Sequence, residues 1–158
     1  MKILRFDHMH VSPEDYDAFV GNLQKLIGHD VIMNMPMPEY GMQVAYEPFP
    51  IGLEAFKPVV ESNPSYSFRN ATTAKGIFSI AFKVENLAEA TAEMEANGWK
   101  KLEEYPNGPI QEALFDTKKD FGFYMELIEY PFNTLGEMFA LAAQAAQAAQ
   151  AEQTCENN

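Results

Sequence analysis

The chain has one cysteine and few basic residues, and both shortages limit what it can be. Cys155 is the only cysteine among 158 residues, so no disulfide can form within the chain. Only 11 Lys and Arg residues stand against 23 Asp and Glu residues, which gives a net charge of −12. Negative charge opposes binding to nucleic acid and to anionic membrane surfaces, so we expect neither as a partner. The lack of a disulfide framework favours a cytoplasmic location.

Long apolar runs and several common catalytic motifs are also missing. No segment reaches the ~18 apolar residues of a membrane-spanning helix. The opening residues, MKILRFDH, do not have the apolar stretch of a signal peptide. There is no glycine-rich phosphate loop, no CxxC, no HExxH and no GxSxG. We therefore expect no membrane span, and the sequence disfavours P-loop nucleotide binding, thiol redox chemistry, zinc-protease activity and serine-hydrolase activity.

What the chain does contain is an internal repeat. The first copy begins with FDHMHV (Phe6–Val11) and closes with IGLEAF (Ile51–Phe56), and the second begins with GIFSIAFKV (Gly76–Val84) and closes with FYMELIEY (Phe123–Tyr130). An offset of 71 residues places His8 on Ser79, and an offset of 72 places Glu54 on Glu126. Potential metal ligands thus recur at matching positions of two copies, which is more informative than any single motif here.

Each copy has the pattern strand, helix and three strands. The first copy predicts a helix with Ser12 as N-cap, Pro13 and Asp15 in its first turn, and Gly28 at its end. The second copy predicts a helix over 86–97 that ends at Gly98, with a turn at 118–120. Alternating or apolar runs predict the strands. These runs are 3–11, 31–36, 42–46 and 51–56 in the first copy, and 77–84, 99–104, 110–116 and 123–130 in the second.

These patterns predict one domain over residues 1–132, built from repeats at 1–57 and 75–132 with a linker at 58–74. Residues 133–158 are rich in alanine and glutamine and predict a C-terminal helix followed by a tail. Thr134 and Glu137 have the spacing of a capping box at the start of that helix. We expect the far end of the helix either to fray or to pack on a partner subunit.

Four stretches carry a resemblance to a known superfamily. They are Asp7-His8, VAYEPFPIGLEAF (Val44–Phe56), IAFKVENLAEA (Ile80–Ala90) and MELIEYP (Met125–Pro131). With the repeat, they make the chain resemble the vicinal-oxygen-chelate superfamily of glyoxalases, bleomycin-resistance proteins and extradiol dioxygenases. It looks most similar to the methylmalonyl-CoA epimerase and glyoxalase-like members. The resemblance implies an α+β fold in which tandem βαβββ units form a curled, half-barrel mixed sheet around a metal-holding cleft.

The resemblance also implies metal ligands at His8, Glu54 and Glu126, and it places Ser79 where the family normally has histidine. Imidazole and carboxylate groups suit a divalent ion such as Mn, Co, Ni, Fe or Zn. A serine hydroxyl is a poor ligand, so Ser79 either hydrogen-bonds a bound water or leaves a position open. Glu54 and Glu126 interrupt apolar strand ends, where an unpartnered buried carboxylate would cost several kcal/mol. These two carboxylates therefore require a cation, a shared proton or solvent.

Further side chains are expected on the same side of the sheet. His10 follows His8 by two residues and so faces the same way on a regular strand. Four roles remain open for His10. It donates a hydrogen bond to a metal-bound group, contacts the substrate, replaces the absent histidine as a ligand, or is only a polar residue packed behind the cleft. Tyr46, Tyr124 and Tyr130 are further cleft-facing residues. A cluster of methionines and one tyrosine either lines an apolar substrate pocket or belongs to the core or a dimer interface: Met33, Met35, Met37, Tyr40 and Met42.

Together these observations predict a metal-assisted isomerase, epimerase or lyase. The substrate would be a small organic molecule with a carbonyl or vicinal oxygens, and Glu54 or Glu126 would move the proton next to that carbonyl. Extradiol dioxygenase activity is disfavoured, because Ser79 removes one histidine of the iron site that this reaction needs. The alternative is a metal-free protein that sequesters a small ligand, and a subunit that has lost its chemistry is a third possibility. A homodimer is possible by resemblance.

Overall fold

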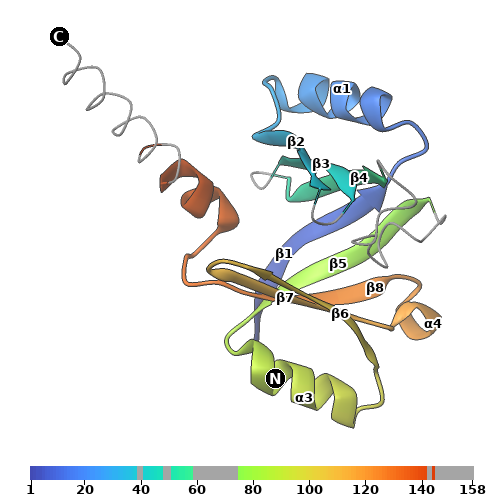
Figure 1. Ribbon diagram of the computed structural model, residues 1–158, viewed down its shortest axis with the longest axis vertical. Helices are drawn as coiled ribbons and strands as arrows, with labels where there is room; N and C mark the ends of the chain where they lie inside the picture. The colour runs from blue at the N-terminus through green and yellow to red at the C-terminus, as the bar shows by residue number, and fades with distance from the viewer. Residues whose placement is uncertain (39–40, 48–50, 59–74, 142–143, 145–158) are drawn as a thin grey trace.

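The computed structural model describes residues 1–38, 41–47, 51–58, 75–141 and 144. Within these residues, eight strands form one mixed, curled sheet in the order β2-β3-β4-β1-β5-β8-β7-β6 (Figure 1). The strands are β1 (Ile3–Ser12), β2 (Met33–Met37), β3 (Met42–Glu47), β4 (Leu53–Pro58), β5 (Gly76–Val84), β6 (Lys101–Asn107), β7 (Ile110–Phe115) and β8 (Tyr124–Glu129). This arrangement confirms the predicted α+β fold of two βαβββ units, with each predicted strand in its place and its ends shifted by a few residues.

The two units are related by the sequence repeat, and they meet where β1 and β5 pair antiparallel. In the first unit β4 is parallel to β1, and in the second unit β8 is parallel to β5. Within the β1–β5 ladder, His8 faces Ala81 and His10 faces Ser79. The offset of 71 residues places His8 on Ser79 and His10 on Ala81, so the repeat exchanges the two pairs. The repeat therefore corresponds to an approximate two-fold relation at the centre of the sheet.

Each central strand carries a β-bulge at the repeat-related position. On β1, Asp7 has no ladder partner on β5, because Phe6 pairs with Phe82 and the next residue, His8, already pairs with Ala81. On β5, Phe78 lies between Ser79, which pairs with His10, and Ile77, which pairs with Val11, at a shift in the ladder register. A bulge locally interrupts the alternation of a strand and redirects a side chain, and bulges are common beside functional sites.

Helices α1 (Tyr16–Ile27) and α3 (Leu87–Ala96) pack on the outer face of the sheet, one against each unit (Figure 1). The prediction that Ser12 caps α1 was wrong, and Asp15 is the N-cap, with its carboxylate accepting from the Ala18 amide at 2.9 Å. The physical reason is that Ser12 is the last residue of β1, where it pairs with Gly76. The end of α1 at Gly28, with a φ of 81°, is as predicted.

In the second unit, Asn86 caps α3, and the predicted turn at 118–120 is part of a short helix, α4 (Lys118–Phe121).

The inner face of the sheet holds a hydrophobic cluster that joins both units. It comprises Met42, Val44, Tyr46, Phe56, Phe78, Tyr105, Leu114, Ile128, Tyr130 and Leu135.

The C-terminal segment continues this inner face. Residues 135–141 are helical, and Leu135 is buried against the inner cluster. The predicted capping box is present in part: Thr134 accepts from the Glu137 amide at 2.9 Å, but the Glu137 carboxylate accepts from the amide of Asn133, the residue before the N-cap, at 3.0 Å. The predicted linker, apart from residue 58, and most of the Ala/Gln-rich stretch lie outside the described residues. Within the part of the chain that is described, no helix has the length and apolar character needed to cross a membrane.

Candidate metal centre and substrate cavity

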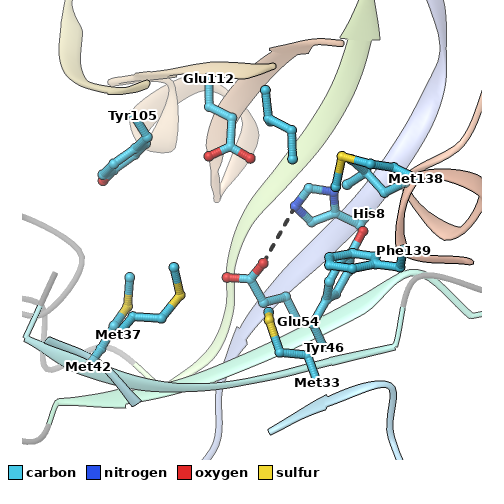
Figure 2. Close-up of a pocket in the computed structure, with 12 residues that line it drawn as sticks. His8, Met33, Met37, Met42, Tyr46, Glu54, Tyr105, Glu112, Met138 and Phe139 are labelled. Carbon is cyan, nitrogen blue, oxygen red and sulfur yellow. Dashed lines mark ion pairs between the residues drawn. The ribbon is translucent and has the colours of Figure 1, made fainter. Parts of the chain in front are cut away.

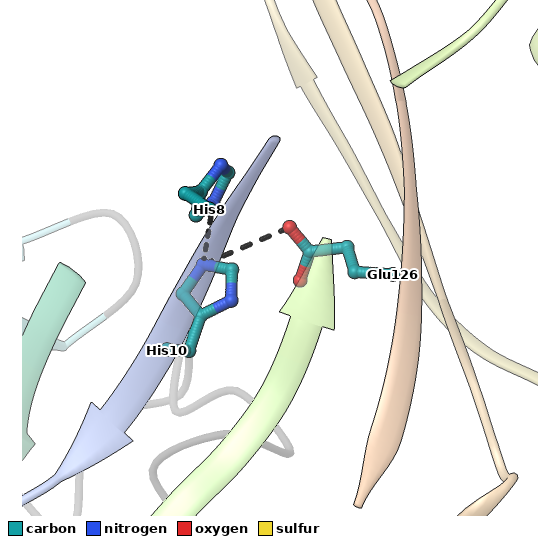
Figure 3. Close-up of side chains that lie close together, drawn as sticks. All are labelled: His8, His10 and Glu126. Carbon is teal, nitrogen blue, oxygen red and sulfur yellow. Dashed lines mark hydrogen bonds and ion pairs between the residues drawn. The ribbon is translucent and has the colours of Figure 1, made fainter. Parts of the chain in front are cut away.

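Two histidines of β1 meet on the inner side of the sheet. His8 and His10 are each 1% exposed, and their Nε2 atoms lie 3.1 Å apart (Figure 3). Their rings meet edge to face, with centroids 4.5 Å apart. The period of two along β1 brings both imidazoles to the same point, as the sequence predicted.

Two glutamates from two other strands reach the same point. Glu126 on β8 is fully buried, and its Oε1 atom lies 3.7 Å from Nε2 of His10. Glu54 on β4 lies opposite His10 in the parallel ladder, with Oε1 at 3.4 Å from Nε2 of His10 and Oε2 at 4.0 Å from Nε2 of His8. Strands β1, β4 and β8 therefore bring together two imidazoles and two carboxylates.

Ser79 lies behind His10. The serine is fully buried, and its Oγ atom shares a hydrogen bond of 2.7 Å with Nδ1 of His10. The two residues are cross-strand neighbours in the β1–β5 ladder. Ser79 thus contacts the far nitrogen of His10, and the opposite nitrogen of that ring faces His8 and the carboxylates.

The Asp7 carboxylate contacts the Nδ1 side of the His8 ring. Its Oδ1 atom lies 2.9 Å from Nδ1 of His8. An ionised carboxylate only accepts hydrogen bonds, so Nδ1 of His8 donates, and the neutral ring presents the lone pair of Nε2 toward His10. Burial alone would lower the pKa of His8, but the hydrogen bond to Asp7 and the nearby charges of Glu54 and Glu126 outweigh it and raise the pKa.

The donor set fits a divalent cation. One ligand atom each from His8, His10 and Glu126 can be chosen so that all lie within 4.8 Å of one another. Two nitrogen ligands about 2.1 Å from one ion and at a right angle are about 3.0 Å apart, close to the observed separation of the two Nε2 atoms. Without a cation or protons, two nitrogen lone pairs and two carboxylates would repel one another in a buried space. The residues present therefore suit a metal centre.

A cavity of about 290 Å³ opens beside this cluster (Figure 2). His8 and Glu54 form part of its wall, and most of the other lining side chains are apolar or aromatic. The complete lining is His8, Met33, Met37, Met42, Tyr46, Glu54, Tyr105, Ile110, Glu112, Leu135, Met138 and Phe139.

Only some of the residues predicted to form a pocket line this cavity. Met33, Met37 and Met42 line it, whereas Met35 is 49% exposed and Tyr40 lies outside the described residues. Tyr46 lines the cavity and packs on the His8 ring, with centroids 5.3 Å apart.

The other two predicted tyrosines lie away from the lining. Tyr124 contacts Phe78 at a centroid distance of 5.0 Å, and Tyr130 donates a hydrogen bond to Asp7. Neither is among the residues that line the cavity.

Sequence reasoning missed part of the cavity wall. Glu112 from β7 and Tyr105 from β6 close the side opposite Glu54 (Figure 2). Met138 and Phe139 come from the C-terminal segment, and the Phe139 ring packs on Tyr46 with centroids 5.9 Å apart. The capping box at Thr134 was the available signal that this segment has a fixed start, but the sequence did not show which surface it covers.

Comparison with known proteins identifies the fold. No protein-family model matches the chain, and no curated protein sequence matches it. Among solved structures, a hypothetical protein from Bacillus halodurans C-125 matches with a TM-score of 0.64 and 20% identity, over 82% of this chain and 96% of that protein. A variant of Streptomyces coelicolor methylmalonyl-CoA epimerase, bound to 2-nitronate-propionyl-CoA, matches with a TM-score of 0.63 and 20% identity, over 83% of this chain and all of that one.

Methylmalonyl-CoA epimerase from Mycobacterium tuberculosis gives a TM-score of 0.63 at 16% identity, over 82% of this chain and 90% of that one. These matches agree with the expectation drawn from the repeat and its motifs. The chain has the fold of the methylmalonyl-CoA epimerases, which is the fold implied by its resemblance to the vicinal-oxygen-chelate superfamily.

Proposed function

We propose that this chain is a metal-assisted isomerase, epimerase or lyase that moves the proton next to a carbonyl group of a small organic substrate. The observation that carries the proposal is the convergence of His8, His10, Glu54 and Glu126 at the wall of an apolar cavity. Structures of similar fold that are named as epimerases support the reaction class, since epimerisation at such a carbon requires removal and return of a proton.

In this proposal His8, His10 and Glu126 hold the ion, and Glu54 borders it. His10 takes the role of the histidine that is missing at position 79, because its Nε2 atom faces the same carboxylates. A divalent ion held there, such as Mn, Co, Ni, Fe or Zn, polarises the substrate carbonyl and makes the adjacent C–H bond more acidic. The nitrogen and oxygen donors are compatible with each of these metals.

Glu54 is the better placed of the two glutamates to act as the base. Its side chain is 13% exposed and lines the cavity, whereas the Glu126 side chain is fully buried and does not line it. A base must come within hydrogen-bonding reach of the proton it removes. We therefore assign proton transfer to Glu54 and ion binding to Glu126.

The cavity restricts the substrate class. Its volume of about 290 Å³ suits a small molecule, and its apolar wall suits a hydrocarbon or aromatic body. Among the described lining residues there is no Lys or Arg, so the cavity offers no ion pair to an anionic group. If the substrate is an acyl thioester, only its acyl part fits inside, and the remainder must lie outside the cavity.

The apolar lining also supports the second function that the sequence left open. Met33, Met37, Met42 and Phe139 give the cavity an adaptable hydrophobic surface, which suits a protein that binds a small ligand without converting it. Such a protein would bind its ligand equally well in the absence of metal.

Exchange of substrate protons in heavy water distinguishes the two functions. Metal-loaded protein is incubated with a panel of small ketones, hydroxyketones and acyl thioesters, and deuterium at the carbon next to the carbonyl is followed by NMR. We expect exchange with at least one compound, and its loss in Glu54→Gln, which keeps the size of the side chain and an amide oxygen beside the ion but removes the base. Glu89→Gln, at an exposed position of α3, is the matched control. Binding of panel compounds without exchange in metal-loaded protein would contradict the proposal and favour the binding protein.

A further inference from the structure

Asp7 is adjacent to His8 in sequence, yet its side chain contacts the His8 ring. On a regular strand, neighbouring side chains point to opposite faces. The bulge at Asp7 removes this restriction, because Asp7 lies between two ladder pairs and has no ladder partner on β5. The β3–β4 turn supports the bulge: the Met9 amide donates to the carbonyl of Gly52 at 2.8 Å, and a Cβ atom at Gly52 would lie 3.0 Å from the Asp7 carbonyl oxygen.

The Asp7 carboxylate receives three side-chain contacts. Oδ1 accepts from Nδ1 of His8 at 2.9 Å, and Oδ2 accepts from Nη2 of Arg5 at 2.9 Å and from the Tyr130 hydroxyl at 2.5 Å. The Asp7 side chain is only 2% exposed, and Arg5 and Tyr130 also contact each other. Both carboxylate oxygens are thus fixed by donors, and the ring of His8 is fixed with them.

The two repeats differ at this position. The offset of 71 residues places Asp7 on Phe78 and His8 on Ser79, and both Asp7 and Phe78 occupy bulges. Phe78 has an apolar environment, with Phe56 and Tyr124 ring centroids 5.3 Å and 5.0 Å away. The carboxylate is therefore found in the repeat that has the histidine, and an apolar side chain is found in the repeat that has the serine.

We propose that Asp7 is a positioning residue that holds His8 in the tautomer with Nε2 available to a metal ion, and that Arg5 and Tyr130 hold Asp7 in place. This inference rests on the proposed metal centre. Asp7 itself is turned away from the ion, because it contacts the Nδ1 side of the ring. Partners of this kind behind a metal-bound histidine fix its orientation, and their loss typically lowers metal affinity by about 10- to 100-fold.

The test compares wild-type protein with Asp7→Asn in two measurements. The first is titration of metal-free protein with Co²⁺, followed by the visible absorption of the bound ion. The second is ¹⁵N NMR of the histidine rings in metal-free protein at alkaline pH, where neutral tautomers are resolved. We expect Asp7→Asn to bind Co²⁺ about 10- to 100-fold more weakly and to lose the Nδ1–H tautomer of His8. Asp17→Asn, an exposed carboxylate on α1, is the control and should change neither measurement.

Unchanged Co²⁺ affinity together with an unchanged His8 tautomer in Asp7→Asn would overturn the proposal. If Asp7→Asn does not fold, Tyr130→Phe removes one donor to Asp7, and unaltered Co²⁺ affinity and an unaltered His8 tautomer in that variant would equally contradict it. The two measurements also separate this inference from the proposed function. A wild-type protein that binds no metal would refute the metal centre, whereas the NMR measurement would still show whether Asp7 determines the tautomer.

Discussion

Nδ1 of His10 lies 2.7 Å from Oγ of Ser79, directly across the antiparallel β1–β5 ladder. The serine therefore occupies the position where the resemblance expects histidine, and it contacts a histidine that the neighbouring strand supplies. Both side chains are buried, and a second large ring at position 79 would compete with His10 for the same space. The site thus has two imidazoles, but both come from β1 and not one from each repeat.

This relationship predicts the outcome of exchanging the two residues. His10→Ala should lose most of the metal bound by the wild-type protein, because one of two nitrogen ligands is removed. The double variant His10→Ala with Ser79→His should recover metal binding, since the new histidine fills the vacated space beside Glu126. Titration of each metal-free variant with Zn²⁺ by calorimetry checks this. Undiminished metal affinity in His10→Ala would show that His10 is not a ligand.

The C-terminal segment is predicted to be part of the folded core. Leu135 is 5% exposed within the inner cluster, so Leu135→Ala should lower the free energy of unfolding by about 2 to 4 kcal/mol. Leu141→Ala removes the same atoms at a position that is 48% exposed, and it should cost less than about 0.5 kcal/mol. Urea denaturation of both variants gives the comparison. Equal effects would mean that the segment is not held against the cavity.

Two glycine substitutions should act in opposite directions. Gly52 has a φ of +64°, and its Cα faces the Asp7 carbonyl, so Gly52→Ala should destabilise the protein by about 1 kcal/mol or more. Gly21 lies within α1, and apart from its chain neighbours and its own helix backbone no described atom would lie within 4 Å of a Cβ there, so Gly21→Ala should stabilise the protein by about 0.5 to 1 kcal/mol.

Thermal or urea unfolding measures both glycine variants. Gly52→Ala should also weaken Co²⁺ binding through the bulge, whereas Gly21→Ala should leave it unchanged. A Gly52→Ala protein with wild-type stability and wild-type Co²⁺ affinity would argue against a role of this turn in supporting Asp7.

Glu112 is predicted to act on the substrate and not on the ion. Its carboxylate faces the cavity from the wall opposite Glu54 (Figure 2). Glu112→Gln should therefore change the KM, or the preference among substrates with hydroxyl or amino groups, while the bound metal stays the same. Kinetics on any substrate found by the deuterium-exchange screen, combined with metal analysis, checks this. A loss of metal in Glu112→Gln would place the residue in the ion's environment instead.

Much of the fold could be read from the sequence, because local signals and tertiary structure agree. The repeat predicted both βαβββ units, and the helix predicted over 86–97 is α3, whose buried face is formed by Leu87, Ala90 and Met94. Ser12 failed as a cap because pairing with β5 extends β1 through that residue. A local capping pattern does not show that a neighbouring strand will compete for the same residue.

The site was only partly predictable for the same reason. Alternation along β1 correctly placed His8 and His10 together. By the same rule Asp7 would lie on the opposite face, and it reaches the His8 ring because of the bulge. The cavity wall formed by Glu112 and Phe139 depends on which distant segments fold over the sheet. No periodicity in the sequence carries that information.

The cluster of His8, His10 and Glu126 is proposed to hold a metal ion. The most direct test is elemental analysis of purified, tag-free protein beside Glu126→Gln, whose side chain is fully buried and 3.7 Å from Nε2 of His10. We predict close to one equivalent of a divalent transition metal in the wild-type protein and a sharp fall in the variant, with the fold retained by circular dichroism. Wild-type protein that is metal-free and also fails to take up Mn, Co, Ni, Fe or Zn would contradict the proposed metal centre.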